Sequence, residues 1–432
     1  MITDNERLGN NMNDYGKRAY ALMEKMDYVR VAGTDGELKA ADVLYGEAAA
    51  MGLQPRYELF EIDAYDIHRA ELEITKPCVK SFPVTGYGLS GDTGDEGLRA
   101  PFIYAENVND ILLAQAKGKI VLVNVRPNGD QYRRMEEAGV AGFITVSGTL
   151  TDDREKTDLD VWFLSRNRHL KDGERRKIPG VAIRAVDAIE LLRYEPAEAV
   201  ITLRQTEKKI TSCNVIVEIE GSDKADEWIA IGAHYDSVPF SHGMYDNASG
   251  SAIIMEACRH FAEHRPRRSL RFIWFGAEEK GLLGSLHHLK VCPDEIKTTK
   301  LMINADLAGQ VIGHHEFAVT AQKEVGGFLK FLAQEKGFGV TVKQNIYSSD
   351  STVYADAGVP AFSFLRAGTI GHNRYDAIKL CSPQTMEKTT EFMIYFTERI
   401  VNSEMLPIPA GIPDDLKEKL DVYFGRKPPK EE

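Results

Sequence analysis

From residue 199 onwards, short apolar segments typical of strands alternate with longer segments of helical periodicity. The expected strands are 215–218, 227–233, 270–275, 301–305, 317–320 and 361–365, and the expected helices are 247–264, 281–290, 324–336, 351–357 and 383–402. Strands separated by helices predict a largely parallel sheet with helices on both faces. We therefore expect an α/β fold built on a doubly wound, mostly parallel sheet.

The length of the chain predicts more than one domain. It has 432 residues, whereas single hydrophobic cores stop growing at roughly 250–300 residues. Helices are expected at 14–26 and 37–51 and a strand at 57–62, after which prolines and glycines mark a change of character. We predict a main domain of residues 1–74 and 200–412, an inserted smaller α/β domain at 75–199 and a C-terminal tail at 413–432.

Charge and composition restrict the partners of the chain. A formal net charge of -12 disfavours binding to nucleic acid or to anionic lipid, because both require clustered Lys and Arg. The five cysteines lack the spacing of a zinc knuckle and are expected to be free thiols. No apolar run approaches the roughly 20 residues that cross a bilayer. We expect no membrane span and a cytoplasmic location as given, or secretion if a signal peptide was trimmed.

Metal-competent side chains follow several of the expected strands. In an open α/β sheet, sites form beyond the carboxyl ends of the strands. The side chains at these positions are His234 and Asp236 after the strand ending at 233, Glu278 and Glu279 after 275, Asp306 after 305 and His372 after 365. Asp246 lies in a glycine-flanked loop before a helix and can turn back to the same edge. We expect these groups to converge.

Imidazole and carboxylate are the ligands expected of Zn²⁺ in a hydrolytic site. Two histidines and three carboxylates are too many for one ion and suit two, about 3.5–4 Å apart. Since consecutive side chains diverge, one of Glu278 and Glu279 is expected to bind metal and the other to act as general base. Asp236 and Asp376 are expected to hold the second ring nitrogens of His234 and His372.

Seven motifs occur in one order along the chain. They are His234-Tyr-Asp-Ser, Tyr245-Asp-Asn-Ala-Ser-Gly, Phe275-Gly-Ala-Glu-Glu-Lys-Gly, Asn304-Ala-Asp, Ser349-Asp, Gly358-Val-Pro and Gly371-His-Asn-Arg-Tyr-Asp. This series resembles the two-zinc aminopeptidase family (peptidase family M28), which also includes glutamate carboxypeptidase and, more distantly, glutaminyl cyclase. The resemblance covers about residues 200–400 and is weaker at 33–60. Residues 75–199 resemble a protease-associated domain, chiefly at 118–123, 138–144 and 178–183.

The resemblance implies a role for each of these side chains. Asp246 would bridge two Zn²⁺ ions, with His234 and Asp306 completing one site and Glu279 and His372 the other, while another divalent metal could replace zinc. Glu278 would be the general base. Tyr347 and Asp350 precede a helix that lines the cleft in the family, which makes them candidates for substrate contact or for stabilising the tetrahedral intermediate.

Three functions are compatible with these features. The first is a metal-dependent exopeptidase acting as an aminopeptidase on peptide substrates. The second is a carboxypeptidase or dipeptidase, in which Arg366 or Arg374 would bind the terminal carboxylate. The third is a catalytically silent, receptor-like binding protein. The chain could also form a homo-oligomer. The histidine pairs 287–288 and 314–315 are interpreted as structural.

Overall fold

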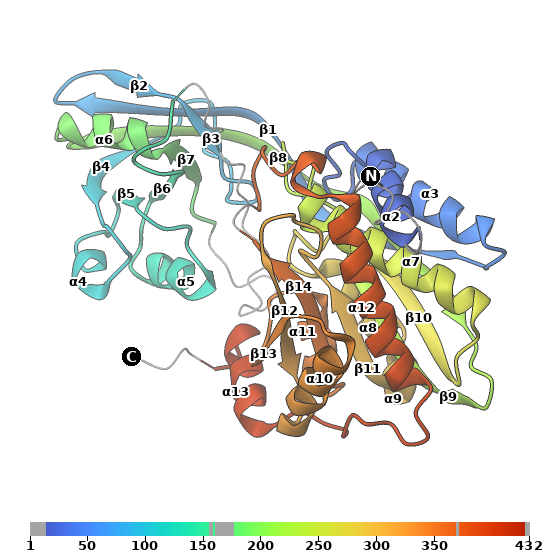
Figure 1. The fold of residues 1–432 in the computed structure, drawn as a ribbon. Helices are drawn as coiled ribbons and strands as arrows, with labels where there is room; N and C mark the ends of the chain where they lie inside the picture. Colours follow the sequence, from blue (N-terminus) through green and yellow to red (C-terminus); the bar gives the residue numbers. More distant parts are fainter. Residues whose placement is uncertain (1–13, 155–158, 160–176, 369–370, 428–432) are drawn as a thin grey trace, which may run out of the picture. The chain divides into compact units, whose positions relative to one another are not determined.

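The structure is a computed structural model that describes residues 14–154, 159, 177–368 and 371–427. The chain divides into two compact units (Figure 1). Unit 1 contains Met1–Ile62 and Thr211–Tyr423, and unit 2 contains Asp63–Ile210 and Phe424–Glu432. Two long strands, β1 (Arg56–Lys76) and β8 (Glu198–Ile219), each contribute residues to both units. The two boundaries therefore lie inside β1 and β8, the same strands that contain the predicted boundaries at positions 74 and 200.

The strands of unit 1 form the mostly parallel sheet that the sequence predicts. Its further strands are β9 (Lys224–His234), β10 (Arg268–Phe275), β11 (Thr299–Ala305), β12 (His314–Thr320), β13 (Val340–Gln344) and β14 (Ala361–Ala367). Their order is β13-β12-β14-β11-β9-β10-β8. Strand β9 pairs in parallel with β10 and β11, and β11 with β14, whereas β12–β14 and β10–β8 are antiparallel. The site described below depends on the parallel trio β10-β9-β11.

Helices cover both faces of this sheet. They are α2 (Tyr15–Lys25), α3 (Asp35–Ala50), α7 (Ser249–Glu263), α8 (Leu283–Val291), α9 (Pro293–Thr298), α10 (Lys323–Lys336), α11 (Asp350–Asp356), α12 (Pro383–Val401) and α13 (Asp414–Tyr423), with the short turns η1 (Met244–Ala248) and η2 (Ile378–Leu380). Strand side chains alternate between faces. Ile231, Phe272 and Ile303 belong to the large core shared with α7 and α12, whereas Phe275 contacts Tyr354 of α11 at a ring distance of 6.4 Å. Both apolar faces of the strands are thus buried.

Three elements of unit 1, α9, β13 and α13, were not expected from the sequence. Strand β13 was not expected, because its residues are partly or fully exposed at the edge of the sheet and lack a continuous apolar run. Helix α13 lies in the segment predicted to be a tail, and it buries Leu416 and Leu420 while packing near α11. Residues 428–432 lie outside the described part of the chain.

Unit 2 is a smaller α/β module. Its elements are β2 (Lys80–Phe82), β3 (Val84–Gly86), β4 (Leu98–Tyr104), α4 (Asp110–Leu113), β5 (Ile120–Val123), α5 (Gly129–Glu137), β6 (Gly142–Ser147), β7 (Gly180–Arg184) and α6 (Ala185–Arg193). Strands β4 to β7 pair in parallel in chain order. A capping box between Asn128 and Gln131 begins α5. The resemblance of this module to a protease-associated domain stays a prediction.

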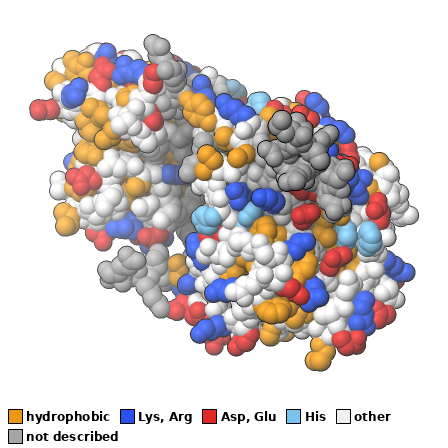
Figure 2. All heavy atoms as spheres, in the orientation of Figure 1, with side chains coloured by type: hydrophobic (Ala, Val, Ile, Leu, Met, Phe, Trp, Pro, Cys, Tyr) orange, Lys and Arg blue, Asp and Glu red, His pale blue; other side chains and the backbone are white. Residues whose placement is uncertain are grey.

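The five cysteines are free in the structure, as the sequence predicts. On the face drawn in Figure 2, acidic and basic side chains of the described residues are interspersed with apolar ones. Among the described helices, none combines the length and the apolar character that a membrane crossing requires.

Candidate metal centre

The predicted ligands converge at the carboxyl ends of three neighbouring strands. His234 is the last residue of β9, Glu278 and Glu279 follow β10, and Asp306 follows β11. Because β9 lies between β10 and β11 and is parallel to both, these ends adjoin one another. Asp246 approaches from η1, directly before α7.

Asp246 divides its two carboxylate oxygens between two histidines. Its Oδ1 lies 3.2 Å from Nε2 of His234, and that nitrogen also lies 3.6 Å from Oδ1 of Asp306. Its Oδ2 lies 3.0 Å from Nε2 of His372, which in turn lies 3.2 Å from Oε2 of Glu279. Two ligands about 2.0–2.1 Å from one ion in tetrahedral geometry are about 3.3 Å apart. The spacing therefore fits two cation sites that share Asp246.

Several atoms that face these two sites have no hydrogen-bond partner among the described residues. They are Nε2 of His234, Oε1 of Glu279 and Oδ1 of Asp306, all of which are buried. Buried polar atoms in proteins are nearly always paired, because an unpaired one costs free energy. Nitrogen and oxygen ligands directed at a shared space would be satisfied by divalent cations, so the donor set fits the predicted metals.

The charges of the cluster perturb one another strongly. Burial would raise the pKa of Asp246, but His234 and His372 hold it below its usual value. The pKa of Glu279 rises to about 7, because burial and the charge of Asp246 outweigh His372. Hydrogen bonds to Asp246 and Glu279 raise the pKa of His372 to about 11. The positive charge of an imidazolium or of a bound cation at this position would therefore stabilise the ionised carboxylates.

Glu278 lies beside this ligand set. Its carboxylate, that of Glu279 and the ring of His234 are close enough to face one ion. Burial raises the pKa of Glu278 well above its usual value, and the charges of Glu279 and Asp350 add to this rise against the opposing effect of His234. A raised pKa makes a carboxylate a stronger proton acceptor, which suits it to the role of general base.

Asp236 lies where the sequence predicts it and makes further contacts. Its Oδ1 lies 3.4 Å from Nδ1 of His234. Its two oxygens also accept hydrogen bonds from the backbone N–H groups of Glu278, at 3.0 Å, and Glu279, at 3.2 Å. One carboxylate thus lies beside the imidazole and holds the loop that carries both glutamates through two hydrogen bonds. The backbone contacts were not predicted.

Asp376 differs from its predicted role. It accepts hydrogen bonds from the backbone N–H groups of Tyr245, at 2.7 Å, and Asp246, at 2.9 Å, and in the described structure it makes no hydrogen bond to His372. The segment between His372 and Asp376 forms turns and no helix, so a spacing of four residues does not bring the side chains together. Asp376 therefore positions Asp246.

Two buried charged residues near the site were missed by sequence reasoning. Arg30 donates to the backbone carbonyls of Tyr235, at 2.7 Å, and Gly243, at 2.9 Å, which flank the loop between His234 and Asp246. Glu37 accepts from the backbone N–H of Ala277 at 3.2 Å, directly before Glu278. Burial and the charge of Asp236 raise the pKa of Glu37 to about 8. No local signal reveals them, since their partners lie some 200 residues away in sequence.

The three predicted substrate contacts separate into two groups. Burial raises the pKa of Tyr347 and Asp350, in the latter case to about 7, and the nearby charge of Asp306 adds to both shifts, so both side chains adjoin the cluster. Arg366 is engaged elsewhere. Its guanidinium donates to the carbonyls of Gln310, at 2.6 Å, and Val311, at 3.0 Å. The structure therefore does not support Arg366 as an anchor for a substrate carboxylate.

Replacing Asp376 with asparagine is expected to weaken cation binding. Asp376→Asn keeps one acceptor but turns an amide N–H towards the second backbone N–H, which loosens Asp246. Loss of such a supporting hydrogen bond lowers metal affinity by about 10–100-fold. A Zn²⁺ titration in the presence of a competing chelator measures this change. The matched control is Asp415→Asn, at an exposed position on α13. Equal Zn²⁺ affinities for the two variants would contradict the role of Asp376.

Comparison with known proteins agrees with this geometry. Residues 214–397 match the model of peptidase family M28. Aminopeptidase YwaD of Bacillus subtilis is 29% identical and aligns over 94% of this chain and 89% of its own length. Human carboxypeptidase Q is 24% identical over 92% of this chain and 89% of its own length.

Solved structures show the same fold. The structure of BSAP, a zinc aminopeptidase from Bacillus subtilis, superposes with a TM-score of 0.75 at 24% identity, covering 94% of this chain and 100% of that chain. The aminopeptidase from Aneurinibacillus sp. strain AM-1 gives a TM-score of 0.73 at 23% identity. The match of residues 214–397 to the model of peptidase family M28, the near full-length relatives and the shared fold all agree with the motif series of this chain.

Proposed function

We propose that this chain is a metal-dependent exopeptidase that uses two Zn²⁺ ions and acts as an aminopeptidase, releasing N-terminal residues from peptides. The observation that carries the proposal is the division of the Asp246 carboxylate between His234 and His372, at 3.2 Å and 3.0 Å. Each histidine is joined by one further carboxylate, Asp306 or Glu279. Two near-equivalent ligand sets around one bridging carboxylate are the arrangement that a two-cation hydrolase needs.

When bound, such a cation pair polarises the peptide carbonyl and lowers the pKa of the attacking water. Glu278 then accepts a proton from that water and delivers it to the leaving amine. Its position is fixed by the hydrogen bond from its backbone N–H to Asp236 at 3.0 Å. Tyr347 is assigned to donate its hydroxyl proton in a hydrogen bond to the oxyanion of the tetrahedral intermediate.

The charge of the site favours an N-terminal amine over a C-terminal carboxylate. Asp350 is fully buried beside the cluster, and neither of its oxygens has a hydrogen-bond partner among the described residues. The carboxyl group of Asp350, beside Glu278 and Glu279, could accept a hydrogen bond from an ammonium group, whose positive charge would favour the ionised carboxylate. Arg366, one of the two carboxylate anchors suggested for the carboxypeptidase alternative, donates instead to backbone carbonyls. Relatives named aminopeptidases support the same choice.

The activity is tested with two classes of substrate. Amino-acid p-nitroanilides, which have a free α-amine, are expected to be hydrolysed, and N-blocked dipeptides are expected to be resistant. Chelation should abolish the activity and added Zn²⁺ should restore it. Cleavage of blocked dipeptides alone would indicate a carboxypeptidase, and metal binding without hydrolysis of either class would indicate a silent binding protein.

Glu278→Gln is expected to retain Zn²⁺ while kcat falls by about 10²–10⁴-fold, because the amide cannot accept the proton of the water. Steady-state kinetics together with metal analysis by atomic emission checks both parts. Glu263→Gln, at an exposed position at the end of α7, is the control and should behave as the unaltered enzyme. Turnover preserved in Glu278→Gln would exclude Glu278 as the base.

Tyr347→Phe is expected to lower kcat by about 10²–10³-fold with little change in KM, since the lost hydrogen bond forms only in the transition state. The control is Tyr395→Phe on α12, which also removes a tyrosine hydroxyl. The hydroxyl of Tyr395 donates a hydrogen bond to Glu335 and takes no part in the site. A Tyr347→Phe variant that matches Tyr395→Phe in kcat would assign Tyr347 a packing role.

A further inference from the structure

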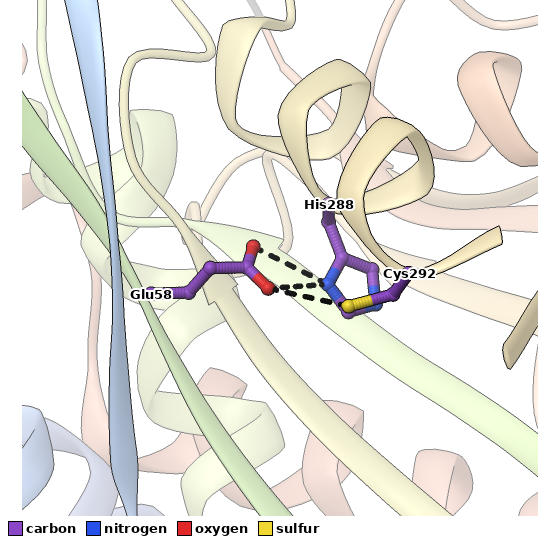
Figure 3. Close-up of side chains that lie close together, drawn as sticks. All are labelled: Glu58, His288 and Cys292. Carbon is purple, nitrogen blue, oxygen red and sulfur yellow. Dashed lines mark hydrogen bonds and ion pairs between the residues drawn. The ribbon is translucent and has the colours of Figure 1, made fainter.

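A second group of metal-competent side chains lies at the carboxyl end of α8. Glu58 comes from β1, His288 from α8, and Cys292 directly follows that helix. Nδ1 of His288 lies 3.1 Å from Oε2 of Glu58, and Sγ of Cys292 lies 3.7 Å from the same oxygen. Figure 3 shows the carboxylate, the ring and the thiol directed towards one another. None of these residues belongs to the proposed catalytic cluster.

The two distances to Glu58 are close to those expected between ligands of one cation, and all three ligand atoms lie within 4.8 Å of one another. For Zn²⁺ with bonds of about 2.0–2.1 Å to nitrogen or oxygen and about 2.3 Å to sulfur, tetrahedral ligands lie about 3.3 Å apart for N and O and about 3.5 Å for S and O. The observed separation of 3.1 Å between N and O is slightly shorter than expected, and that of 3.7 Å between S and O is slightly longer. Glu58 and Cys292 are only partly buried, which leaves an entry path and a fourth position for water.

The surrounding residues support the three ligands. Nε2 of His288 lies 3.3 Å from Oε2 of Glu295, so the ring nitrogen that would not bind metal faces a carboxylate. This arrangement fixes the ring and raises its basicity in known metal sites. Arg271 holds Glu295 at 3.0 Å. The other supported ligand is Glu58, which accepts a hydrogen bond from Asn214 at 2.8 Å.

We propose that Glu58, Nδ1 of His288 and Sγ of Cys292 bind a single divalent cation of the zinc type, separate from the pair at Asp246. An imidazole, a thiolate and a carboxylate together favour zinc over magnesium or calcium, which prefer oxygen ligands. The Cys292 thiol loses its proton to solvent on binding, so one S–H bond is exchanged for one metal–sulfur bond.

The consequence for the fold is a crosslink between β1 and the end of α8. Helix α8 begins at Leu283, four positions after Glu279, so the cation would hold the far end of the helix that follows the catalytic loop. The role is structural, and it does not depend on the proposed peptidase activity. The alternative is an imidazolium ion between Glu58 and Glu295 with a protonated thiol beside it.

Cobalt separates these arrangements, because a thiolate bound to Co²⁺ gives a ligand-to-metal charge-transfer absorption and the cluster at Asp246 contains no cysteine. Metal-free full-length protein is titrated with Co²⁺ while absorption and peptidase activity are both followed. We expect a thiolate–Co²⁺ absorption whose final amplitude corresponds to one thiolate-bound Co²⁺ per chain, whatever the occupancy of the cluster at Asp246. Activity restored by Co²⁺ without this absorption would overturn the proposal and leave the proposed function intact, whereas absorption without activity would do the reverse.

Variants locate the signal. Cys292→Ser should remove the thiolate absorption, while Cys78→Ser, at an exposed cysteine of unit 2, should retain it. Glu295→Gln leaves the three ligands in place and should raise the half-saturating Co²⁺ concentration by about 10–100-fold. Circular dichroism confirms that each variant is folded. Absorption that persists in folded Cys292→Ser would also overturn the assignment, and the unaltered protein tests it even if a variant fails to fold.

Discussion

The mutual repulsion of carboxylates at one desolvated edge of the sheet is the constraint on which the rest of unit 1 depends. Asp246, Glu279 and Asp306 lie within reach of the same two imidazoles. Removing charge from water is costly unless an opposite charge lies close by. Such an edge is stable only with added positive charge, which protonated histidines or bound cations can supply. The same requirement is met by the divalent cations of the proposed function.

The fold meets this constraint with hydrogen bonds from distant segments. Asp236 accepts hydrogen bonds from the loop after β10, and Asp376 accepts one from the backbone N–H of Asp246. Arg30 donates to a backbone carbonyl of the loop between β9 and η1. None of these three residues provides a ligand in the proposed scheme. They fix the positions of groups that would otherwise move apart, because rigid support is what keeps a site in its productive geometry.

The main features of the fold and the types of candidate ligand could be predicted because they depend on local sequence patterns. The strands that end at His234, Phe275 and Ala305 are apolar and flanked by helices. Because sites in parallel sheets lie beyond the carboxyl ends of the strands, the polar residues that follow them were predicted to lie together. Edge strand β13 escaped because its side chains are partly exposed. The partner of Asp376 was not predicted correctly because residues four apart in a turn, unlike those in a helix, have no fixed distance between their side chains.

By itself, the sequence determined that this chain folds as an α/β protein and that its motif series resembles that of peptidase family M28, since periodicity and motif order can be read without coordinates. Only the tertiary structure decided which groups touch. The division of the Asp246 oxygens, the engagement of Arg366 by backbone carbonyls, and the meeting of Glu58 with His288 and Cys292 across some 230 residues all depend on it. The physical reason is that hydrogen bonds and ligand bonds act over about 3 Å in space, a distance that separation along the chain does not encode.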